Sequence, residues 1–279
     1  MQVWADEILP PSQFGFRKGK STIDAAKTLR DNIHLYVNSS SGKYYACFID
    51  FEKAFDTVDR NLLLEKLIRY GLQGKTLQMV RAICETNFQY IVDGGHRSRE
   101  IPQSRGVAQG DKLSPLLFSL YIADMHYYLQ DHNVNIIFYA DDLVIGSNNL
   151  EAVQNCLNDI AEYCRRNALR INVRKTEVVK FRKGGRLSKF DKLTVNSQEI
   201  KFVNSFEYLG IIFSSGFAFS HHLEHLKNKA TKTIYSLGQK LDFSKISFNS
   251  AHILMESVVY PAATYAIDIF AHVKTTATN

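Results

Sequence analysis

Two adjacent aspartates, Asp141 and Asp142, stand between two short apolar runs with the composition of β-strands, residues 135–138 and 143–146. This pattern predicts a β-hairpin that displays both carboxylates at its tip. Neighbouring carboxylates repel each other unless a positive charge lies between them, and hard oxygen ligands favour Mg²⁺ or Mn²⁺. The tip is therefore a candidate metal site, although aspartate is also common in ordinary turns.

A third carboxylate, Asp50, ends another aromatic and apolar run, residues 44–49, and is followed by the pattern of a turn and a helix. An acid at a strand end beside a hairpin tip can complete a site for two metal ions. Two ions serve phosphoryl transfer, because one lowers the pKa of the attacking hydroxyl and the other stabilises the leaving pyrophosphate. The spacing of Asp56 and Asp59 suits turn and cap positions instead.

Hydrophobic periodicity predicts the elements that must position these acids. Helices are expected between Asp59 and Gly71, over 76–85, from Ser114 as the cap before Pro115 to Leu129, over 153–164, and from Ser220 onward with a break or kink at Pro261. A hairpin is expected over 88–101, strands over 177–181 and 207–213, and an exposed turn over 182–186.

Composition narrows the class of protein without deciding it. The 279 residues are 45% hydrophobic, enough to bury a core, and the net charge of +6 favours a polyanionic partner. No run of 18 apolar residues and no apolar N-terminal stretch is present, so neither a membrane span nor a signal peptide is predicted. The four cysteines lie in apolar patterns without CxxC spacing and are interpreted as reduced core thiols, which indicates an intracellular protein: Cys47, Cys84, Cys156 and Cys164.

At this point the chain resembles a known family. Residues 48–56 (FIDFEKAFD), 105–115 (RGVAQGDKLSP) and 139–142 (YADD) resemble the successive palm motifs of reverse transcriptases, most closely those of non-LTR (LINE-type) retrotransposons. Residues 14–22 resemble the fingers motif of these proteins, and residues 206–210 resemble the primer-grip region. Any one motif is weak, whereas five in the right order are specific.

The resemblance implies an α+β fold, the right-hand polymerase palm, with an antiparallel sheet backed by helices. It implies partial fingers over 1–44, a palm over 45–219 with an intervening fingers hairpin, and a thumb-like helical segment over 220–279. It also implies that the chain is a portion of a retrotransposon polyprotein or a gene derived from one, since the fingers motif comes almost first and no endonuclease domain or Cys/His-rich tail is recognised.

The activity that the resemblance implies is RNA-directed DNA polymerisation in retrotransposition. Deoxynucleotides (dNTPs) would be added to the 3′-OH of a DNA primer on an RNA template, with two Mg²⁺ ions that Mn²⁺ can replace, and no membrane is involved. Asp50 and Asp141 would bind both ions, and Asp142 would be a more peripheral acid. Phe51 would bind an ion through its backbone carbonyl. The oligomeric state stays open.

Other residues are assigned to the substrate by the same resemblance. Phe55 corresponds to an aromatic gate whose ring would clash with a ribose 2′-OH, which is a steric mode of selection; a core phenylalanine is the alternative. Gln109 corresponds to the residue that touches the nucleotide sugar and base, and Gly110 permits close backbone approach. Tyr139 would pack against the primer end.

The basic candidates rest on weaker signals. Arg17 and Lys18 fall in a glycine-punctuated segment suited to closing on a triphosphate, and Arg17 is favoured because its donor fork is fixed. Lys175 matches the fourth palm motif, where a lysine would protonate the leaving pyrophosphate, although a lone lysine is commonly a solvated charge. A zinc site at His221, His222 and His225 is not predicted, because HExxH and a nearby cysteine are absent; a polar first helical turn after Ser220 is preferred.

Two other functions compete with the main hypothesis. The first is a non-catalytic, co-opted nucleic-acid-binding protein that keeps the polymerase fold, which loss of any of the three acids would have favoured. The second is an RNA-dependent RNA polymerase, which also uses palm aspartates, although Phe55 favours deoxynucleotides.

Overall fold

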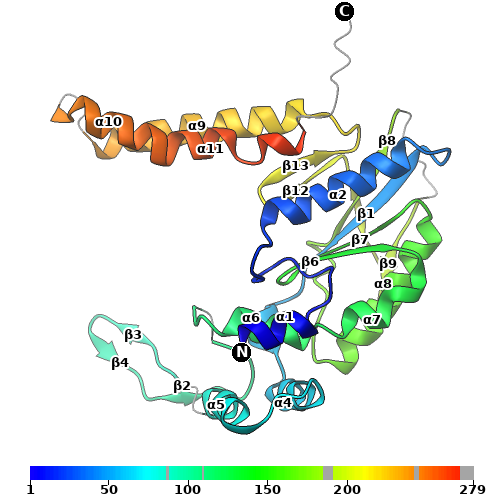
Figure 1. Ribbon diagram of the computed structural model, residues 1–279, viewed down its shortest axis with the longest axis vertical. Coiled ribbons are helices and arrows are strands. Elements are labelled where there is room, and N and C mark those ends of the chain that lie inside the picture. The colour runs from blue at the N-terminus through cyan, green and yellow to red at the C-terminus, as the bar shows by residue number, and fades with distance from the viewer. Residues whose placement is uncertain (86–87, 109, 185–190, 242–244, 271–279) are drawn as a thin grey trace, which may run out of the picture.

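The computed structural model describes the chain apart from residues 86–87, 109, 185–190, 242–244 and 271–279. A five-stranded sheet in the order β11-β8-β1-β7-β6 lies at its centre (Figure 1). The strands are Lys43–Ile49 (β1), Asn135–Tyr139 (β6), Asp142–Ser147 (β7), Glu177–Arg182 (β8) and Lys201–Val203 (β11). The predicted α+β class is confirmed.

The sheet is antiparallel except at one edge. β1 pairs antiparallel with β7 and β8, and β6 pairs antiparallel with β7, but β11 runs parallel to β8. The prediction of a purely antiparallel sheet is therefore wrong at β11. The chain reverses in a small hairpin of Thr194–Val195 (β9) and Gln198–Glu199 (β10) before it returns to the sheet.

Strand β1 is buried on both faces, which explains its unbroken apolar sequence. Tyr45 and Cys47 belong to one core cluster, and Tyr44 and Phe48 belong to the other. Because side chains alternate along a strand, only a central strand covered on both sides needs such a sequence. Asp50 follows directly as the first acidic residue after this strand.

The larger core lies on the first face of the sheet, where Leu150–Arg166 (α8) packs on β7 and β1, and it continues beyond the end of the sheet. Further helices contribute their apolar sides to this core: Gln2–Ile8 (α1), Arg60–Arg69 (α4), Gly74–Glu85 (α5), Ser114–Tyr121 (α6) and Met125–Leu129 (α7). In α8 the predicted stripe of Val153, Leu157, Ile160 and Cys164 is buried, as expected for an amphipathic helix. All four cysteines are buried free thiols, as the sequence predicted.

The helix predicted from Ser114 to Leu129 is broken after Tyr121. Lys66, buried on α4, donates from Nζ to the Tyr121 carbonyl at 2.8 Å and to Asp124 Oδ1 at 2.8 Å. The next helical turn therefore closes differently, with the Met125 amide on the Ile122 carbonyl at 3.0 Å. The helix also begins one residue early, because Leu113 occupies the cap position predicted for Ser114.

The boundaries of α4 agree with the sequence. Asp59 caps the helix by accepting hydrogen bonds from the amides of Asn61 and Leu62 at 3.0 and 3.2 Å. The helix ends at Arg69, and Gly71 follows with φ = +89°, the left-handed conformation that glycine adopts without strain.

A two-part hairpin projects from the helical end of the molecule, as predicted (Figure 1). Phe88–Gln89 (β2) pairs with Ile101–Pro102 (β5), and Val92–Asp93 (β3) pairs with His96–Arg97 (β4) around Gly94 and Gly95.

The second face of the sheet is covered by Thr22–Val37 (α2) and by a hairpin of Ser205–Tyr208 (β12) and Ile211–Ser214 (β13). The prediction of one strand over 207–213 is therefore wrong. Leu209 and Gly210 have φ = +50° and +79°, a tight turn that joins two antiparallel strands.

The C-terminal helices form an arm that extends away from the sheet (Figure 1). It consists of Ser220–Lys240 (α9), Phe248–Leu254 (α10), a π-helical turn over Met255–Val259 and Tyr260–Thr264 (α11). The π turn ends two residues before Pro261, whose missing amide donor explains the predicted break or kink. Among the described residues, no helix is both long and apolar enough to cross a bilayer.

The first turn of α9 is not the polar surface that the sequence suggested. Phe219, not Ser220, occupies the cap position, and His222 is fully buried. His222 Nδ1 accepts a hydrogen bond from the Ile212 amide at 3.4 Å, and its Nε2 lies 3.2 Å from the Tyr265 carbonyl. This histidine therefore joins the root of the arm to β13.

Of the turn predicted over 182–186, residues 185–186 lie outside the described part of the chain.

Candidate active site

Strand register brings Asp50 and the hairpin tip together. Ile49 on β1 pairs with Leu143 on β7, and one further step of the same antiparallel register places Asp50 opposite Asp142. Tyr139 pairs with Asp142 to close the β6–β7 hairpin, so Asp141 lies in its turn. The predicted hairpin tip and its position beside the end of β1 are both confirmed.

The tip is clamped from the N-terminal segment. The Gln13 side chain, 1% exposed, accepts hydrogen bonds through Oε1 from the Ala140 amide at 3.1 Å and the Gly15 amide at 2.9 Å. Ala140 has φ = +56°, a strained conformation that this contact helps to hold. Gly15 lies so close that a Cβ there would be 2.4 Å from the Ala140 nitrogen.

Asp50 is fixed by the segment that follows α8. The Asn172 amide donates to the Asp50 carbonyl at 2.8 Å, and the Asp50 amide donates to Thr176 Oγ1 at 3.3 Å. Thr176 is fully buried and donates in turn to the Asn172 carbonyl at 2.9 Å. These bonds hold the main chain of Asp50, whose side chain lines the same pocket as Asp142.

The three carboxylates influence one another electrostatically. Burial raises the pKa of Asp141, and the charge of Asp50 raises it further. Partial desolvation, followed by the charges of Asp141 and Asp50, raises the pKa of Asp142 to about 6, although part of this side chain is exposed to solvent. A nearby cation would relieve this mutual repulsion, and carboxylate oxygens are the ligands that Mg²⁺ and Mn²⁺ prefer. The donor set therefore fits a divalent ion.

The acidic side chains nevertheless do not form a complete metal-binding cluster. Within the part of the chain that the structure describes, no group of three or more His, Cys, Asp or Glu side chains converges closely enough to hold an ion as it stands. To bind a metal ion, the carboxylates would have to move closer together, and their mutual repulsion opposes this movement when no cation is present.

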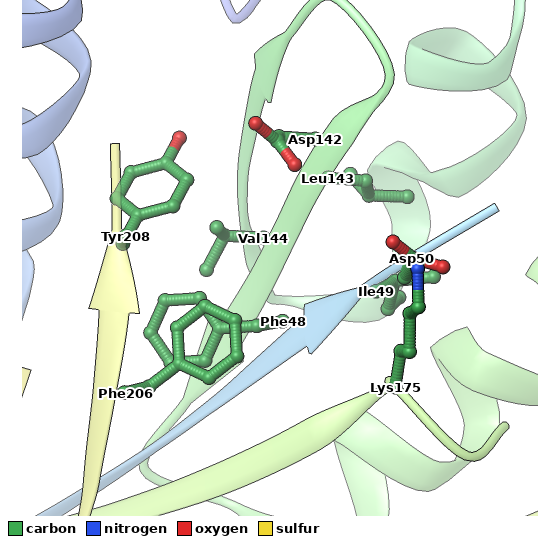
Figure 2. Close-up of a pocket in the computed structure, with 9 residues that line it drawn as sticks. All are labelled: Phe48, Ile49, Asp50, Asp142, Leu143, Val144, Lys175, Phe206 and Tyr208. Carbon is green, nitrogen blue, oxygen red and sulfur yellow. The ribbon is translucent and has the colours of Figure 1, made fainter. Parts of the chain in front are cut away.

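A pocket of about 190 Å³ opens beside the acids (Figure 2). Asp50, Asp142 and Lys175 line it, and Figure 2 shows the Lys175 ammonium on the side of Asp50. Its other wall is aromatic: the rings of Phe48 and Phe206 stack with centroids 4.1 Å apart, and Tyr208 stands next to them. The pocket thus joins acidic, basic and apolar surfaces at the end of the sheet.

The Tyr208 hydroxyl faces this acidic site from the β12–β13 hairpin (Figure 2). The residue is 2% exposed, and its hydroxyl has no hydrogen-bond partner among the described residues. Burial, followed by the charges of Asp142 and Tyr139, raises its pKa above the usual range. Burial likewise raises the pKa of Tyr139, which packs against the same core cluster. A buried polar atom without a partner marks a position where a ligand group could bind.

Phe55 lies at the edge of the larger core, beside the segment 105–110. It belongs to a short helix, Ala54–Thr57 (α3), and its half-buried ring is tilted against that of Phe118 with centroids 4.9 Å apart. Its carbonyl accepts a hydrogen bond from the Val107 amide at 2.9 Å. Gly110 is exposed with φ = +89°, and Gln109 lies outside the described residues. The predicted roles of Phe55, Gln109 and Gly110 stay predictions.

Arg17 binds main-chain carbonyls near the N-terminus, and its predicted role at a triphosphate stays a prediction. Its guanidinium donates to the carbonyls of Pro10 at 2.9 Å and Asp6 at 3.0 Å, so it joins the segment 14–22 to α1 and the residues that follow it. It is not among the described residues that line the pocket. Lys18 is exposed, and Phe51 is buried in an isolated bridge with Ile171.

Sequence reasoning missed Gln13, Thr176 and the hydroxyl of Tyr208. Gln13 and Thr176 are polar residues that become buried only after distant segments meet, and neither has charge or spacing that distinguishes it. Tyr208 belongs to the motif over 206–210, but its orientation depends on the tight turn at Leu209, which was not predicted.

Comparison with known proteins agrees with the motifs. The model of the family described as reverse transcriptase (RNA-dependent DNA polymerase) matches residues 1–213. The chain is 27% identical to the RNA-directed DNA polymerase from mobile element jockey of Drosophila funebris over 94% of this chain and 30% of that protein. It is 25% identical to a Pol polyprotein from the type-1 retrotransposable element R2 of Popillia japonica, over 80% of this chain and 38% of that protein.

Solved structures share the fold at low sequence identity. Apo telomerase from Candida tropicalis, truncated from its C-terminal domain, aligns with a TM-score of 0.56 and 14% identity over 78% of this chain and 43% of that one. The chain thus spans about a third of the length of the relatives in mobile elements. The family match covers most of the chain, and its relatives come from non-LTR elements, so the chain belongs to the reverse transcriptase (RNA-dependent DNA polymerase) family, in its non-LTR (LINE-type) branch.

Proposed function

We propose that the protein is an RNA-directed DNA polymerase that extends a DNA primer on an RNA template, as a step of retrotransposition. One observation carries the proposal: strand register sets Asp50 opposite Asp142, with Asp141 in the adjoining turn. All three acids of the family motifs are present in a chain whose family match spans residues 1–213.

In this proposal Asp50, Asp141 and Asp142 hold two Mg²⁺ or Mn²⁺ ions, with the Phe51 carbonyl as a further ligand. Such ions lower the pKa of an attacking hydroxyl and neutralise charge on the leaving group. The raised pKa values of Asp141 and Asp142 support the assignment, because carboxylates that repel one another gain from a shared cation.

The other residues would bind and orient the primer and the nucleotide, and one of them would transfer a proton. The aromatic wall of Phe48, Phe206 and Tyr208 would hold the primer end through apolar contacts, with Tyr139 beside it. Lys175, exposed at the mouth of the pocket, would give a proton from Nζ to the leaving pyrophosphate. Phe55 would exclude a ribose 2′-OH by bulk, with Gln109 and Gly110 against the nucleotide, and Lys18 would contact its phosphates.

The domain division follows the same proposal. Residues 1–44 would be partial fingers, 45–219 the palm with an intervening fingers hairpin, and 220–279 a thumb. The arm of α9 to α11 supports this division, because it leaves the sheet as a separate helical unit (Figure 1). An RNA–DNA hybrid would be held mainly by contacts to its backbone.

Primer extension on poly(rA)/oligo(dT) tests the proposal. Wild type should incorporate dTTP with Mg²⁺ or Mn²⁺ and lose activity with a chelator, and Asp141→Asn should be inactive while binding the hybrid at least as tightly, since a negative charge facing phosphate is removed. Asp131→Asn, an exposed carboxylate on the surface turn after α7, is the matched control.

Substantial extension by Asp141→Asn would refute the metal assignment. Tight hybrid binding by wild type without any extension would favour the non-catalytic nucleic-acid-binding protein, and preferential incorporation of ribonucleotides would favour an RNA polymerase.

A further inference from the structure

Arg60, the first residue of α4, is a buried cation bound by main-chain carbonyls. It is 9% exposed. Its Nε donates to the Gly106 carbonyl at 2.8 Å, Nη1 donates to the carbonyls of Cys84 at 2.6 Å and of Gln103, and Nη2 donates to Arg105 at 3.2 Å. No carboxylate forms an ion pair with it among the described residues. Burial of a charge is costly, so this arrangement requires most of the donors of the planar fork.

The four carbonyls come from the two ends of one excursion of the chain. Cys84 lies in the last turn of α5, where helix carbonyls lack partners, and the other three carbonyls belong to the segment 103–106 that returns from the projecting hairpin. Arg60 therefore adds to the β2–β5 pairing at the base of this excursion and fixes the end of α5 and the segment 103–106 to α4.

The returning segment is fastened to the backbone around Phe55. The Gly106 amide donates to the Val58 carbonyl at 2.8 Å, and the Val107 amide donates to the Phe55 carbonyl at 2.9 Å. A Cβ on Gly106 would lie 2.8 Å from the Asp56 carbonyl oxygen, and φ there is +84°, so the approach needs glycine. A shift of the 103–106 segment would accordingly be transmitted to Phe55 and to the loop that leads to Gly110.

We infer that Arg60 is a positioning residue for nucleotide selection, holding the 103–107 segment against Phe55 so that the site discriminates between deoxyribose and ribose. The inference rests on the proposed polymerase function. Arg60 acts through the main chain and does not touch the nucleotide. Small displacements of groups that orient a substrate change rates strongly, and selection by bulk depends on where the ring stands.

The test variant is Arg60→Lys, which keeps the charge but replaces the fork with a single ammonium. We expect the ratio of kcat/KM for dTTP over UTP on poly(rA)/oligo(dT) to fall about tenfold, with a larger change in KM for dTTP than in its kcat. Arg69→Lys is the matched control, because Arg69 stands on the same helix but is 70% exposed and pairs with Glu65 at 3.4 Å. Its ratio should equal that of wild type.

Hydrogen exchange supplies a readout that does not depend on catalysis. In Arg60→Lys the amides of Gly106 and Val107 should exchange faster than in wild type, whereas those of β1 should keep their protection. If Arg60→Lys does not fold, Gly106→Ala displaces the same segment from its other side and should lower the same ratio.

The outcomes separate the two proposals. An active Arg60→Lys protein with an unchanged ratio and KM would overturn the inference and leave the proposed function intact. An equal loss in Arg69→Lys would also overturn it, since the effect would then follow from replacing any arginine on α4 and not from the carbonyl contacts of Arg60. Failure of wild type itself to extend a primer would overturn the proposed function and nucleotide selection with it.

Discussion

The tip of the β6–β7 hairpin is clamped by hydrogen bonds from another segment, whereas the α9–α11 arm joins the sheet near its root. At the tip, Gln13 Oε1 binds the amides of Ala140 and Gly15, and the Phe14 amide bonds to the Phe138 carbonyl at 2.8 Å. The main chain of the tip can therefore move little without breaking several hydrogen bonds, while the carboxylates can still change rotamer.

The arm is attached in a different way. Of the 21 residues of α9, only His222 and Leu226 are buried, and both lie in its first two turns. Farther out, large apolar side chains such as Ile234 and Tyr235 are exposed. We therefore expect substitutions around the tip to alter chemistry and substitutions along the arm to alter affinity for a partner.

The largest expected effect comes from the acids themselves. Asp50→Asn should lower the rate of extension by about a thousandfold or more, because a shared ligand of both ions is lost. Asp142→Asn should cost at least about tenfold less, since Asp142 is assigned as the more peripheral acid. Single-turnover extension at saturating hybrid measures both, with thermal melts as a check on folding. Equal losses in the two variants would contradict the graded assignment.

Gly15→Ala tests whether the clamp on the tip matters. The new Cβ would lie 2.4 Å from the Ala140 nitrogen, so the N-terminal segment or the tip must move. We expect a loss of about a hundredfold in kcat, with destabilisation of about 1–3 kcal/mol from overpacking. Gly216→Ala is the matched control, because no atom lies within 4 Å of its added Cβ. A fully active Gly15→Ala protein would show that the clamp is dispensable.

The same contrast explains what could be predicted from sequence. The position of Asp50 beside the tip was predicted from the metal chemistry that the three acids share. The hairpin tip, the strand before Asp50 and the cap at Asp59 depend on local patterns and were also predicted correctly. Each signal is carried by consecutive residues whose preference agrees with the final structure.

Features set by distant residues could not be predicted in this way. The break after Tyr121 depends on Lys66, 55 positions earlier in the sequence, whose charge gave no sign that it would bind a helix carbonyl. Burial of His222 depends on Tyr265, and the place of Arg17 depends on the carbonyls of Asp6 and Pro10. In each case a polar side chain is satisfied by tertiary contacts that periodicity does not encode.

Phe55→Val tests whether Phe55 selects the nucleotide sugar or only fills the core, and its expected effect is intermediate. Removing ring volume should let ribonucleotides enter, so the ratio of kcat/KM for dNTP over rNTP should fall about tenfold or more, each tenfold being about 1.4 kcal/mol of lost discrimination. Some loss of stability is expected because the ring contacts Phe118. A variant that melts near the wild-type temperature with an unchanged ratio would identify Phe55 as a core residue alone.

The smallest expected effect concerns the arm. Lys227 and Lys232 are exposed on α9, and if the arm grips the phosphates of a hybrid, each contact contributes a slope of about −0.7 to −0.9 to the dependence of log affinity on log salt concentration. The double variant Lys227→Gln/Lys232→Gln should therefore bind more weakly at low salt and show a shallower salt dependence, with kcat at saturating hybrid unchanged because the tip is untouched. Lys75→Gln removes an exposed lysine from α5 and serves as the control for net charge.

Binding titrations by fluorescence anisotropy between 50 and 200 mM salt, about the range over which such contacts lose most of their affinity, measure the slope. An unchanged slope in the double variant would mean that these lysines are solvated surface, and a fall in kcat would mean that the arm and the tip do not act separately.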